Sequence, residues 1–281
     1  MCPTIQRVKQ LKILITGNRG FIGSHAERFW RKLSAGPTGQ DSLHEIYTYE
    51  WQERQLPRIE GLDWVIHCGA ISSTTERDVA KIMRQNYDFS VWLYEECRKH
   101  DVDMQWSSSA SIYGHGRDFK ESAAVDPRSP YAWSKYLFEH YVEKNPTHRR
   151  CHGFRYFNVF GDNETHKGSQ ASPHSQFTLQ AQTQGIIRVF EGSEHFRRDF
   201  VPVDLVVGTH FQFIQNDIEE NGIWNVGTGT TQSFMDIARN IANQYGALIE
   251  QIPFPDHLNY SYQGYTCADL TKLKQTLQLD K

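Results

Sequence analysis

The chain has 281 residues, long enough for about two domains with a sizeable core. Thirty basic and 33 acidic residues give a net charge of −3, which argues against nucleic-acid binding through a basic face. No apolar run approaches the roughly 20 residues of a membrane helix, and the first ten residues lack the apolar core of a signal peptide. The five cysteines form no CxxC pair, so we expect a reduced, cytoplasmic setting. The histidines show no metal-ligand spacing, so we expect no metal.

Apolar runs alternate with amphipathic stretches through the first half of the chain. Strands are predicted at 11–16, 45–50, 63–70, 103–110 and 151–161, and helices at 21–33, 79–100 and 131–144. Strands and helices that alternate at this spacing form a parallel sheet covered on both faces, so we expect an α/β fold with a doubly wound sheet. After Gly161 the pattern weakens, but a helix at 203–215 and a strand at 222–227 are expected to return to the sheet.

The weaker pattern indicates a second, smaller lobe that is discontinuous in the chain. We expect one domain made of residues 1–156, 201–229 and 263–275, and a lobe made of residues 157–200 and 230–262. The first would bind a dinucleotide and the lobe would bind the substrate.

A glycine-rich turn, TGNRGFIG at 16–23, lies between the first predicted strand and helix. Gly17 permits a tight turn, Gly20 lets the backbone approach a pyrophosphate, and Gly23 lets the helix pack closely on the strand. The amino end of the helix supplies free N–H groups and the positive end of its dipole. The turn therefore predicts a dinucleotide site, and the alternative is a tight turn without a ligand.

Two residues near this turn favour different cofactors. Glu50 ends the second predicted strand, where a carboxylate accepts hydrogen bonds from the adenosine ribose and repels a 2′-phosphate, which favours NAD. Arg19 lies inside the turn, and its guanidinium group is suited to a 2′-phosphate, which favours NADP. Glu50 is alternatively an ordinary charge at a strand end, so the choice stays open.

Tyr131 and Lys135 are four residues apart on a predicted helix and therefore share one face. An ammonium group near a phenol lowers the phenol pKa from about 10, which suits a general acid or base. The strand before this helix ends in three serines, of which Ser109 is expected to donate to a substrate oxygen. Turn formation is the alternative role for the serine cluster.

Four motifs together resemble the extended short-chain dehydrogenase/reductase family, whose fold is a Rossmann-type sheet with a smaller substrate lobe. They are TGNRGFIG (16–23), SSSASIYG (107–114), YAWSK (131–135) and FRYFNVFG (154–161). The resemblance implies catalytic roles for Ser109, Tyr131 and Lys135, and a nucleotide-sugar contact for Asn158. It also implies a nicotinamide cofactor, NADP with NAD as the alternative, that is held by Gly17, Asn18, Arg19, Gly20, Phe21, Ile22, Gly23, Glu50, Ala70, Asn86, Tyr131 and Lys135.

Further stretches resemble the ADP-L-glycero-D-manno-heptose 6-epimerases within that family. They are GAISSTTERD (69–78), HKGSQAS (166–172), FEGSEHFRRDFVPV (190–203) and IPFPDHL (252–258). The resemblance implies that Lys167 is a second acid/base, that Arg198 binds substrate phosphate, and that Ser72, Tyr262 and Gln263 line the substrate pocket. The implied enzyme is a homo-oligomer of lipopolysaccharide biosynthesis that oxidises and re-reduces C-6″ of an ADP-heptose without net use of cofactor.

Departures from these patterns keep alternatives open. Arg19 resembles the turn of NADP-linked sugar-nucleotide reductases, so an NADPH-dependent reductase, or another epimerase, acting on a different nucleotide-sugar is the alternative. Only residues 51–62 separate the second and third strands, so the sheet is expected to lack an edge strand and its helix. The lysine that family members use to bind a 2′-phosphate also has no counterpart here. Arg19 or Arg54 is expected to take its place. The family's final helix has no counterpart before Lys281. A cofactor-binding protein without catalysis is the third candidate.

Overall fold

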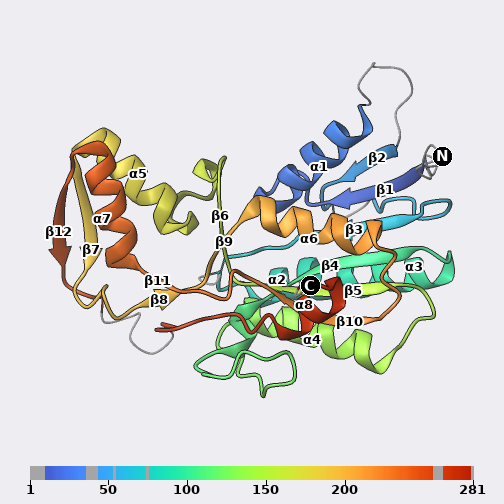
Figure 1. Cartoon of the computed structure of the whole chain (residues 1–281). Helices are drawn as coiled ribbons and strands as arrows, with labels where there is room; N and C mark the ends of the chain where they lie inside the picture. Colours follow the sequence, from blue (N-terminus) through green and yellow to red (C-terminus); the bar gives the residue numbers. More distant parts are fainter. Residues whose placement is uncertain (1–9, 36–43, 53–54, 74–75, 256–261, 280–281) are drawn as a thin grey trace, which may run out of the picture.

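The computed structural model describes residues 10–35, 44–52, 55–73, 76–255 and 262–279. Its strands are β1 (Leu11–Thr16), β2 (His44–Tyr49), β3 (Trp64–His67), β4 (Asp103–Ser109), β5 (Cys151–Tyr156), β6 (Asn158–Phe160), β7 (Ile186–Phe190), β8 (Arg197–Arg198), β9 (Phe200–Pro202), β10 (Gly222–Val226), β11 (Gln232–Ser233) and β12 (Leu248–Ile252). Its helices are α1 (Phe21–Ser34), α2 (Val79–Ile82), η1 (Met83–Asp88), α3 (Phe89–Lys99), η2 (Ala110–Tyr113), α4 (Pro130–Lys144), η3 (Thr165–Gln170), α5 (Pro173–Gln184), α6 (Val203–Gln215), α7 (Phe234–Tyr245) and α8 (Thr271–Leu277). Figure 1 shows a main body around the large sheet and a smaller lobe at one end.

Six parallel strands form the main sheet, in the order β10-β5-β4-β3-β1-β2. The predicted doubly wound α/β fold is therefore confirmed. β2 is the edge strand, and residues 50–52 and 55–63 contain no further strand or helix before β3. The expected loss of one strand and helix after β2 is thus confirmed in the described part of that segment.

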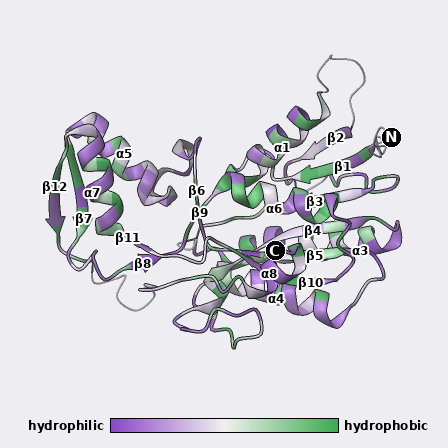
Figure 2. Ribbon diagram, in the orientation of Figure 1, coloured by the Kyte–Doolittle hydropathy of each residue, from purple (hydrophilic) through white to green (hydrophobic). Residues whose placement is uncertain are grey.

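Helices cover both faces of the sheet and bury its apolar side chains. On one face α1 packs against α6, and Ile13 and Ile15 of β1 meet Trp30 of α1. On the other face α3 and α4 cover β4, where Leu93 and Phe138 enter the core. Figure 2 shows the hydrophobic residues along the sheet strands and on the inner sides of these helices. No helix in the described ranges is long and apolar enough to cross a membrane.

Two predicted elements differ from the structure. The strand expected at 151–161 is divided, because β5 ends at Tyr156 and β6 pairs with β9 outside the main sheet. The backbone N–H of Phe157 still donates to Val226 of β10, but that of Asn158 donates to Asp199, so the chain leaves the sheet between these two residues. The helix expected at 79–100 runs as α2, η1 and α3, and η1 is π-helical.

The small lobe has a core of its own. α5 and α7 pack together over the parallel pair β7 and β12, and Phe177, Ile187, Met235 and Ile241 are buried between them. Asp199, which is fully buried, joins the segments that cross between the two bodies, because its carboxylate accepts backbone N–H bonds from residues 228, 229 and 268.

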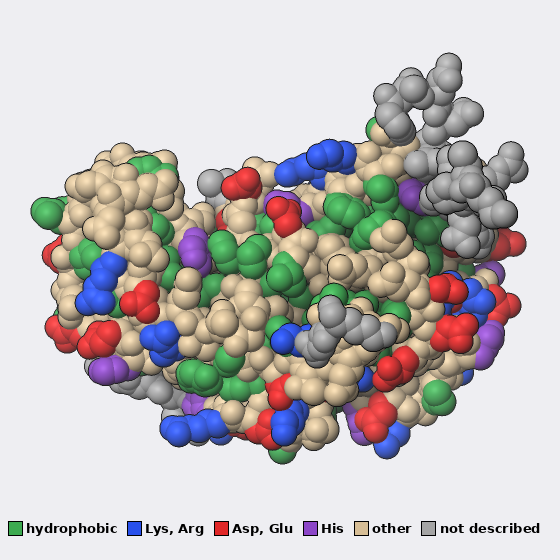
Figure 3. Space-filling model, in the orientation of Figure 1, with side chains coloured by type: hydrophobic (Ala, Val, Ile, Leu, Met, Phe, Trp, Pro, Cys, Tyr) green, Lys and Arg blue, Asp and Glu red, His purple; other side chains and the backbone are tan. Residues whose placement is uncertain are grey.

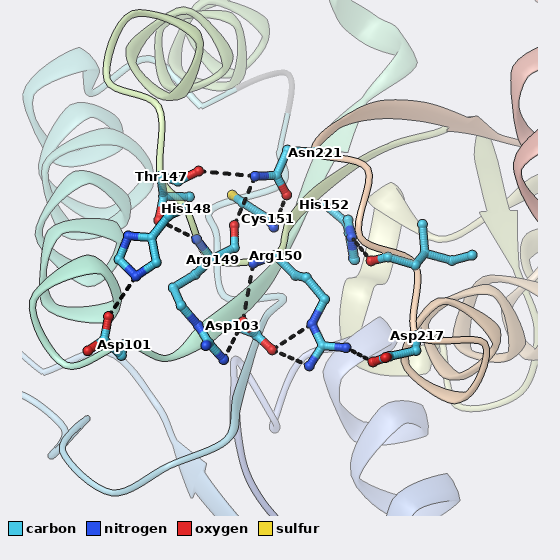
Figure 4. A network of polar contacts seen from close by, with 11 residues as sticks. Asp101, Asp103, Thr147, His148, Arg149, Arg150, Cys151, His152, Asp217 and Asn221 are labelled. Carbon is cyan, nitrogen blue, oxygen red and sulfur yellow. Dashed lines mark hydrogen bonds and ion pairs between the residues drawn. The ribbon is translucent and has the colours of Figure 1, made fainter.

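The amino ends of the neighbouring strands β4, β5 and β10 are joined by polar side chains (Figure 4). Asp103, at the start of β4, is buried, forms an ion pair with Arg149 at 2.8 Å, and accepts a hydrogen bond from Nε of Arg150 at 2.7 Å. Asn221, before β10, accepts from the Cys151 N–H at 2.7 Å and donates to the Arg149 carbonyl at 2.9 Å. This network stabilises the amino-terminal ends of these strands. The serines of β4 lie at the opposite, carboxyl-terminal end.

Candidate active site

The glycine turn is packed so closely that two of its glycines leave no room for a side chain. Gly17 has a left-handed backbone with φ +71°, and a Cβ there would lie 2.4 Å from Cα of Gly69. A Cβ on Gly23 would lie 2.1 Å from the carbonyl oxygen of Gly17, whereas one on Gly20 would lie 3.2 Å from it. The predicted roles of Gly17 and Gly23 in the backbone geometry are confirmed.

The turn leaves the amino end of α1 open. Gly20 is the N-cap residue, no side chain caps the helix, and the first turn contains no acidic residue. Asn18 donates to Glu27 at 3.1 Å, and Ile22 packs against the core of the main body. Uncapped N–H groups at a helix end with the glycine cradle before them fit a pyrophosphate group.

A small cavity of about 60 Å³ lies beside the turn, where the adenosine half of a dinucleotide is expected. Gly17, Glu50, Trp51 and Ala70 line it. The Glu50 carboxylate accepts the backbone N–H of Arg19 at 3.1 Å, which fixes the acidic group against the turn. The Arg19 residue is exposed, and Arg54 lies outside the described residues. Trp51 also lines this cavity but was not predicted as a site residue. The signal that the sequence offered was an aromatic residue directly after Glu50.

Asn86 lies in the π-helical segment η1 and is buried. Its side chain accepts from the Ile71 N–H at 2.7 Å and donates to the Ile71 carbonyl at 2.9 Å and to Ser134 Oγ at 3.1 Å. Asn86 therefore fastens the loop that contains Ala70 to α4, and its amide is engaged by protein atoms.

The three predicted catalytic residues of the main body come together where β4 ends and α4 begins. Ser129 caps α4 and Pro130 starts it, which places Tyr131 on the first turn, where it is hydrogen-bonded to Ser109. Lys135 is 3% exposed, and its Nζ donates to the Ser107 carbonyl at 2.9 Å.

The expected lowering of the Tyr131 pKa is wrong for this structure. Burial raises the pKa of Tyr131 above 10, and the hydrogen bond with Ser109 opposes this only in part. Burial also lowers the pKa of Lys135 to about 8, while Cys68 and Glu139 oppose the fall. The Lys135 ammonium is directed to a backbone carbonyl, and the loss of water around each group is the largest cause of its pKa shift.

A buried ion pair between Glu139 and Arg155 lies behind the catalytic residues and was not predicted from the sequence. Glu139, one helical turn after Lys135, accepts from Arg155 Nε at 3.0 Å and NH2 at 2.7 Å, and from Ser108 Oγ at 2.5 Å. Both partners are almost fully buried. The i, i+4 spacing of Lys135 and Glu139 was the available signal.

Lys167 enters the site from the η3 segment between the two bodies. Its Nζ donates to Glu164 Oε2 at 2.8 Å and lies 4.5 Å from the ring centroid of Phe21, the first residue of α1. Phe21 is buried, and its ring faces Lys167 at the end of the glycine turn. The structure thus brings Lys167 to the carboxyl end of β1, next to the predicted pyrophosphate cradle.

Arg198 is a buried cation that faces aromatic rings. It is 5% exposed, and its guanidinium carbon lies 5.1 Å from the Tyr262 ring centroid and 5.8 Å from that of Phe234. Within the described ranges no carboxylate forms an ion pair with it, and burial lowers its pKa. A buried guanidinium group of this kind is suited to a phosphate ligand.

The remaining predicted substrate residues are placed around the junction of the two bodies. Asn158 is exposed on β6, and its Oδ1 lies 3.4 Å from the Thr266 hydroxyl. Gln263 donates to the Gly114 carbonyl at 2.6 Å, and Ser72 is exposed in the loop after β3. In Figure 3, hydrophobic side chains gather in the middle of one face, and most acidic and basic side chains lie around the rim of that face.

A second hollow, of about 780 Å³, lies between α4 and α8. None of the predicted site residues lines it, so size alone does not mark the reactive site.

Comparison with known proteins places this arrangement in a family. Residues 13–227 match the NAD dependent epimerase/dehydratase family. The chain is 34% identical to an ADP-L-glycero-D-manno-heptose-6-epimerase of Brachyspira hyodysenteriae, over 93% of this chain and 90% of that protein.

Solved structures agree on the fold. The Helicobacter pylori ADP-L-glycero-D-manno-heptose-6-epimerase has a TM-score of 0.83 at 21% identity, over 99% of this chain and 93% of that one. The Thermus thermophilus UDP-glucose 4-epimerase complex with NAD has a TM-score of 0.76 at 23% identity, over 94% and 92%. The glycine cradle, the Tyr131 and Lys135 pair and these matches together show that the chain belongs to the NAD dependent epimerase/dehydratase family.

Proposed function

We propose that the protein is a nucleotide-sugar epimerase that interconverts ADP-D-glycero-D-manno-heptose and ADP-L-glycero-D-manno-heptose at C-6″. The observation that carries this proposal is the position of Lys167, which is paired with a buried carboxylate beside the first residue of α1. It supplies a second proton-transferring group in addition to Tyr131. The 34% identity to a heptose epimerase over nearly the whole chain supports the choice of substrate.

A nicotinamide cofactor, when bound, supplies the acceptor and donor of hydride. The uncapped end of α1 would hold its pyrophosphate, and Glu50 its adenosine ribose. Lys135 would bind near the nicotinamide end and orient Tyr131. Glu50 favours NAD as the cofactor, and NADP is the alternative.

Proton transfer is assigned to two side chains. Tyr131, with Ser109 donating to the same oxygen, would take the proton of the C-6″ hydroxyl group on one face. The planar carbon that results must be reduced from its other face to change configuration. Lys167 would give a proton to the oxygen in that second orientation.

The small lobe, residues 157–200 and 230–262, is proposed to hold the nucleotide-sugar. Arg198 would bind the diphosphate, because it is a buried cation without a carboxylate partner in the described part of the chain. Ser72, Asn158 and Tyr262 would contact the remainder of the substrate.

The test is to incubate the purified protein with ADP-D-glycero-β-D-manno-heptose and with NAD or NADP in parallel, and to separate the two epimers. We expect an equilibrium mixture without net reduced cofactor. Tyr131→Phe should lower the rate by at least about 100-fold, whereas Tyr136→Phe on the same helix should leave it unchanged. Normal epimerisation by Tyr131→Phe would refute the assignment. Unchanged substrate, with cofactor binding shown separately, would favour the protein without catalysis.

A reductase is the second candidate, because Arg19 is exposed within the cofactor-binding turn. It would act on another nucleotide-sugar and consume NADPH steadily with a keto-sugar. Absence of NADPH consumption with every nucleotide-keto-sugar offered would remove it.

A homo-oligomer is also part of the proposal. Val79 and Trp133 are 53% and 47% exposed on helices α2 and α4, which pack together. We expect size-exclusion chromatography with light scattering to give a mass above that of one chain. A cytoplasmic site of action is proposed as well, and four cysteines in the described part of the chain are free thiols.

A further inference from the structure

Glu164 is a buried carboxylate that the predicted site did not include. Its side chain has no exposed surface, yet it accepts four hydrogen bonds. Oε1 accepts from the Gly161 N–H at 3.1 Å and from Ser172 Oγ at 2.7 Å. Oε2 accepts from the Ser172 N–H at 2.8 Å and from Lys167 Nζ at 2.8 Å. The carboxylate therefore connects the end of β6, the η3 segment and the start of α5.

The hydrogen-bond donors favour the ionised form of Glu164. Burial alone raises its pKa, but the hydrogen bonds from Lys167 and Ser172 outweigh burial, and the pKa lies below its usual value. Lys167 is the one cation that forms an ion pair with Glu164 in the described ranges, because burial lowers the pKa of His174, the other titratable group facing this carboxylate, to about 4. A buried carboxylate without its cation is strongly destabilised, so the two charges hold each other in place.

The position of the Lys167 amine depends on this contact. Its other close neighbour is the Phe21 ring at 4.5 Å, a contact that attracts a cation but fixes no direction. The side chain of Lys167 is 21% exposed, whereas Glu164 is held by three further donors and cannot move freely.

We propose that Glu164 is the positioning residue of Lys167, whose amine it holds toward the reaction site through a hydrogen bond. The inference rests on the proposed epimerisation, in which Lys167 is an acid/base. Glu164 itself touches neither substrate nor cofactor.

The balance of protons makes the proposal testable. Substrate and product carry the same number of protons, and the hydride that leaves C-6″ returns to it. When one of Tyr131 and Lys167 takes a proton from the substrate, the other gives a proton to it. The active form of the pair therefore carries one transferable proton. The rate therefore falls at high pH, where the pair loses this proton. The apparent pKa of this alkaline limb of the pH–rate profile belongs to the pair and not to either residue.

The experiment compares kcat/KM against pH for the wild-type protein and Glu164→Gln. The amide keeps the shape of the side chain and removes the negative charge that pairs with Lys167. We expect the alkaline limb to move to lower pH by about one unit, with kcat reduced more than KM is raised. Ser172→Ala is the matched control, because it removes one donor to Glu164 and leaves the contact with Lys167. It should lower the melting temperature without moving the limb.

Two outcomes would overturn the inference. One is a Glu164→Gln variant that loses rate while its alkaline limb stays in place, which indicates a merely structural role. The other comes from Glu164→Asp, which also serves if the glutamine variant does not fold. The aspartate retains the negative charge but places it farther from Lys167, so kcat should fall while the alkaline limb stays in place. An unchanged kcat contradicts the inference.

A measurement without substrate separates this inference from the proposed function. The rate at which acetic anhydride labels Lys167, followed by mass spectrometry at several pH values, reports the protonation of the amine in the cofactor-bound protein. Glu164→Gln should increase labelling of Lys167 at neutral pH several-fold, with Lys144 as an internal reference. Equal labelling in both proteins refutes the inference even if epimerisation is observed, and faster labelling supports it even if it is not.

Discussion

Replacement of the catalytic lysine is expected to make the cofactor-free protein more stable. Lys135 is 3% exposed, and burial lowers its pKa from 10.5 to about 8. Between these two values the unfolded chain binds more protons than the folded one, so stability rises with pH from about 8 to 10.5 and is lowest below pH 8. The buried ammonium therefore destabilises the fold at neutral pH.

The size of the effect follows from the two pKa values. A difference of about 2.5 pKa units, at about 1.4 kcal/mol per unit, gives about 3 kcal/mol at pH 7. Lys135→Met keeps the apolar stem but loses the hydrogen bond from Nζ to the Ser107 carbonyl, which costs about 1 kcal/mol. The variant should thus gain about 2 kcal/mol at pH 7. At pH 10 the penalty on the ammonium falls below about 1 kcal/mol, and the gain disappears.

Urea unfolding of the cofactor-free wild-type and variant proteins at pH 7 and pH 10 measures this difference. Lys144→Met is the control, because Lys144 lies on the same helix with 63% of its side chain exposed. It should change stability by less than about 0.5 kcal/mol at either pH. A Lys135→Met protein that is less stable at pH 7, or whose gain is the same at both pH values, would refute the reasoning. The variant should also lose epimerase activity, since stability and function conflict at this position.

Three further variants address the cofactor site and the sheet. Gly17→Ala places a methyl group 2.4 Å from Cα of Gly69 on a left-handed backbone and should weaken cofactor binding at least about 100-fold. Calorimetry measures this affinity, and a loss of about tenfold or less would contradict the proposed pyrophosphate site. Glu50→Gln removes the carboxylate beside Arg19 and should raise the affinity for NADP relative to NAD by about tenfold, whereas an unchanged ratio would show that Glu50 does not select the cofactor. Asp103→Asn removes the anion between two arginines and should lower the free energy of unfolding by about 2 to 4 kcal/mol with an unchanged cofactor affinity, and a loss of affinity would contradict its purely structural role.

Local patterns were sufficient to predict the main sheet and the glycine turn. Buried parallel strands are continuous apolar runs, and the short segment 51–62 left no room for another strand and helix, so the edge position of β2 was predictable. The glycine spacing was equally informative, because the close approach of Gly17 to Gly69 excludes other residues there. These features depend on neighbours in sequence or on the geometry of one turn.

Features that depend on distant partners were missed or wrongly predicted. The end of β5 at Tyr156 is set by pairing of the next residues with Val226 and Asp199, which no local pattern records. The Tyr131 pKa rises because of burial, whereas the spacing of Tyr131 and Lys135 reports proximity alone. Glu164 was missed for a different reason, because its donors Gly161, Lys167 and Ser172 are near in sequence but come together only through the fold of an otherwise ordinary polar loop.

The fold separates the groups that stabilise it from those that would react. At the amino ends of β4 and β5, Asp103 is charged, buried and satisfied by two arginines (Figure 4). At the carboxyl ends, Lys135 is buried and donates a hydrogen bond to the Ser107 carbonyl, and burial shifts its pKa toward neutrality. A charge that is fully compensated contributes stability but transfers no proton, whereas one that is incompletely compensated costs stability and has a pKa useful for catalysis. Lys167 lies between these cases, because Glu164 compensates its charge and leaves part of its side chain open to a substrate.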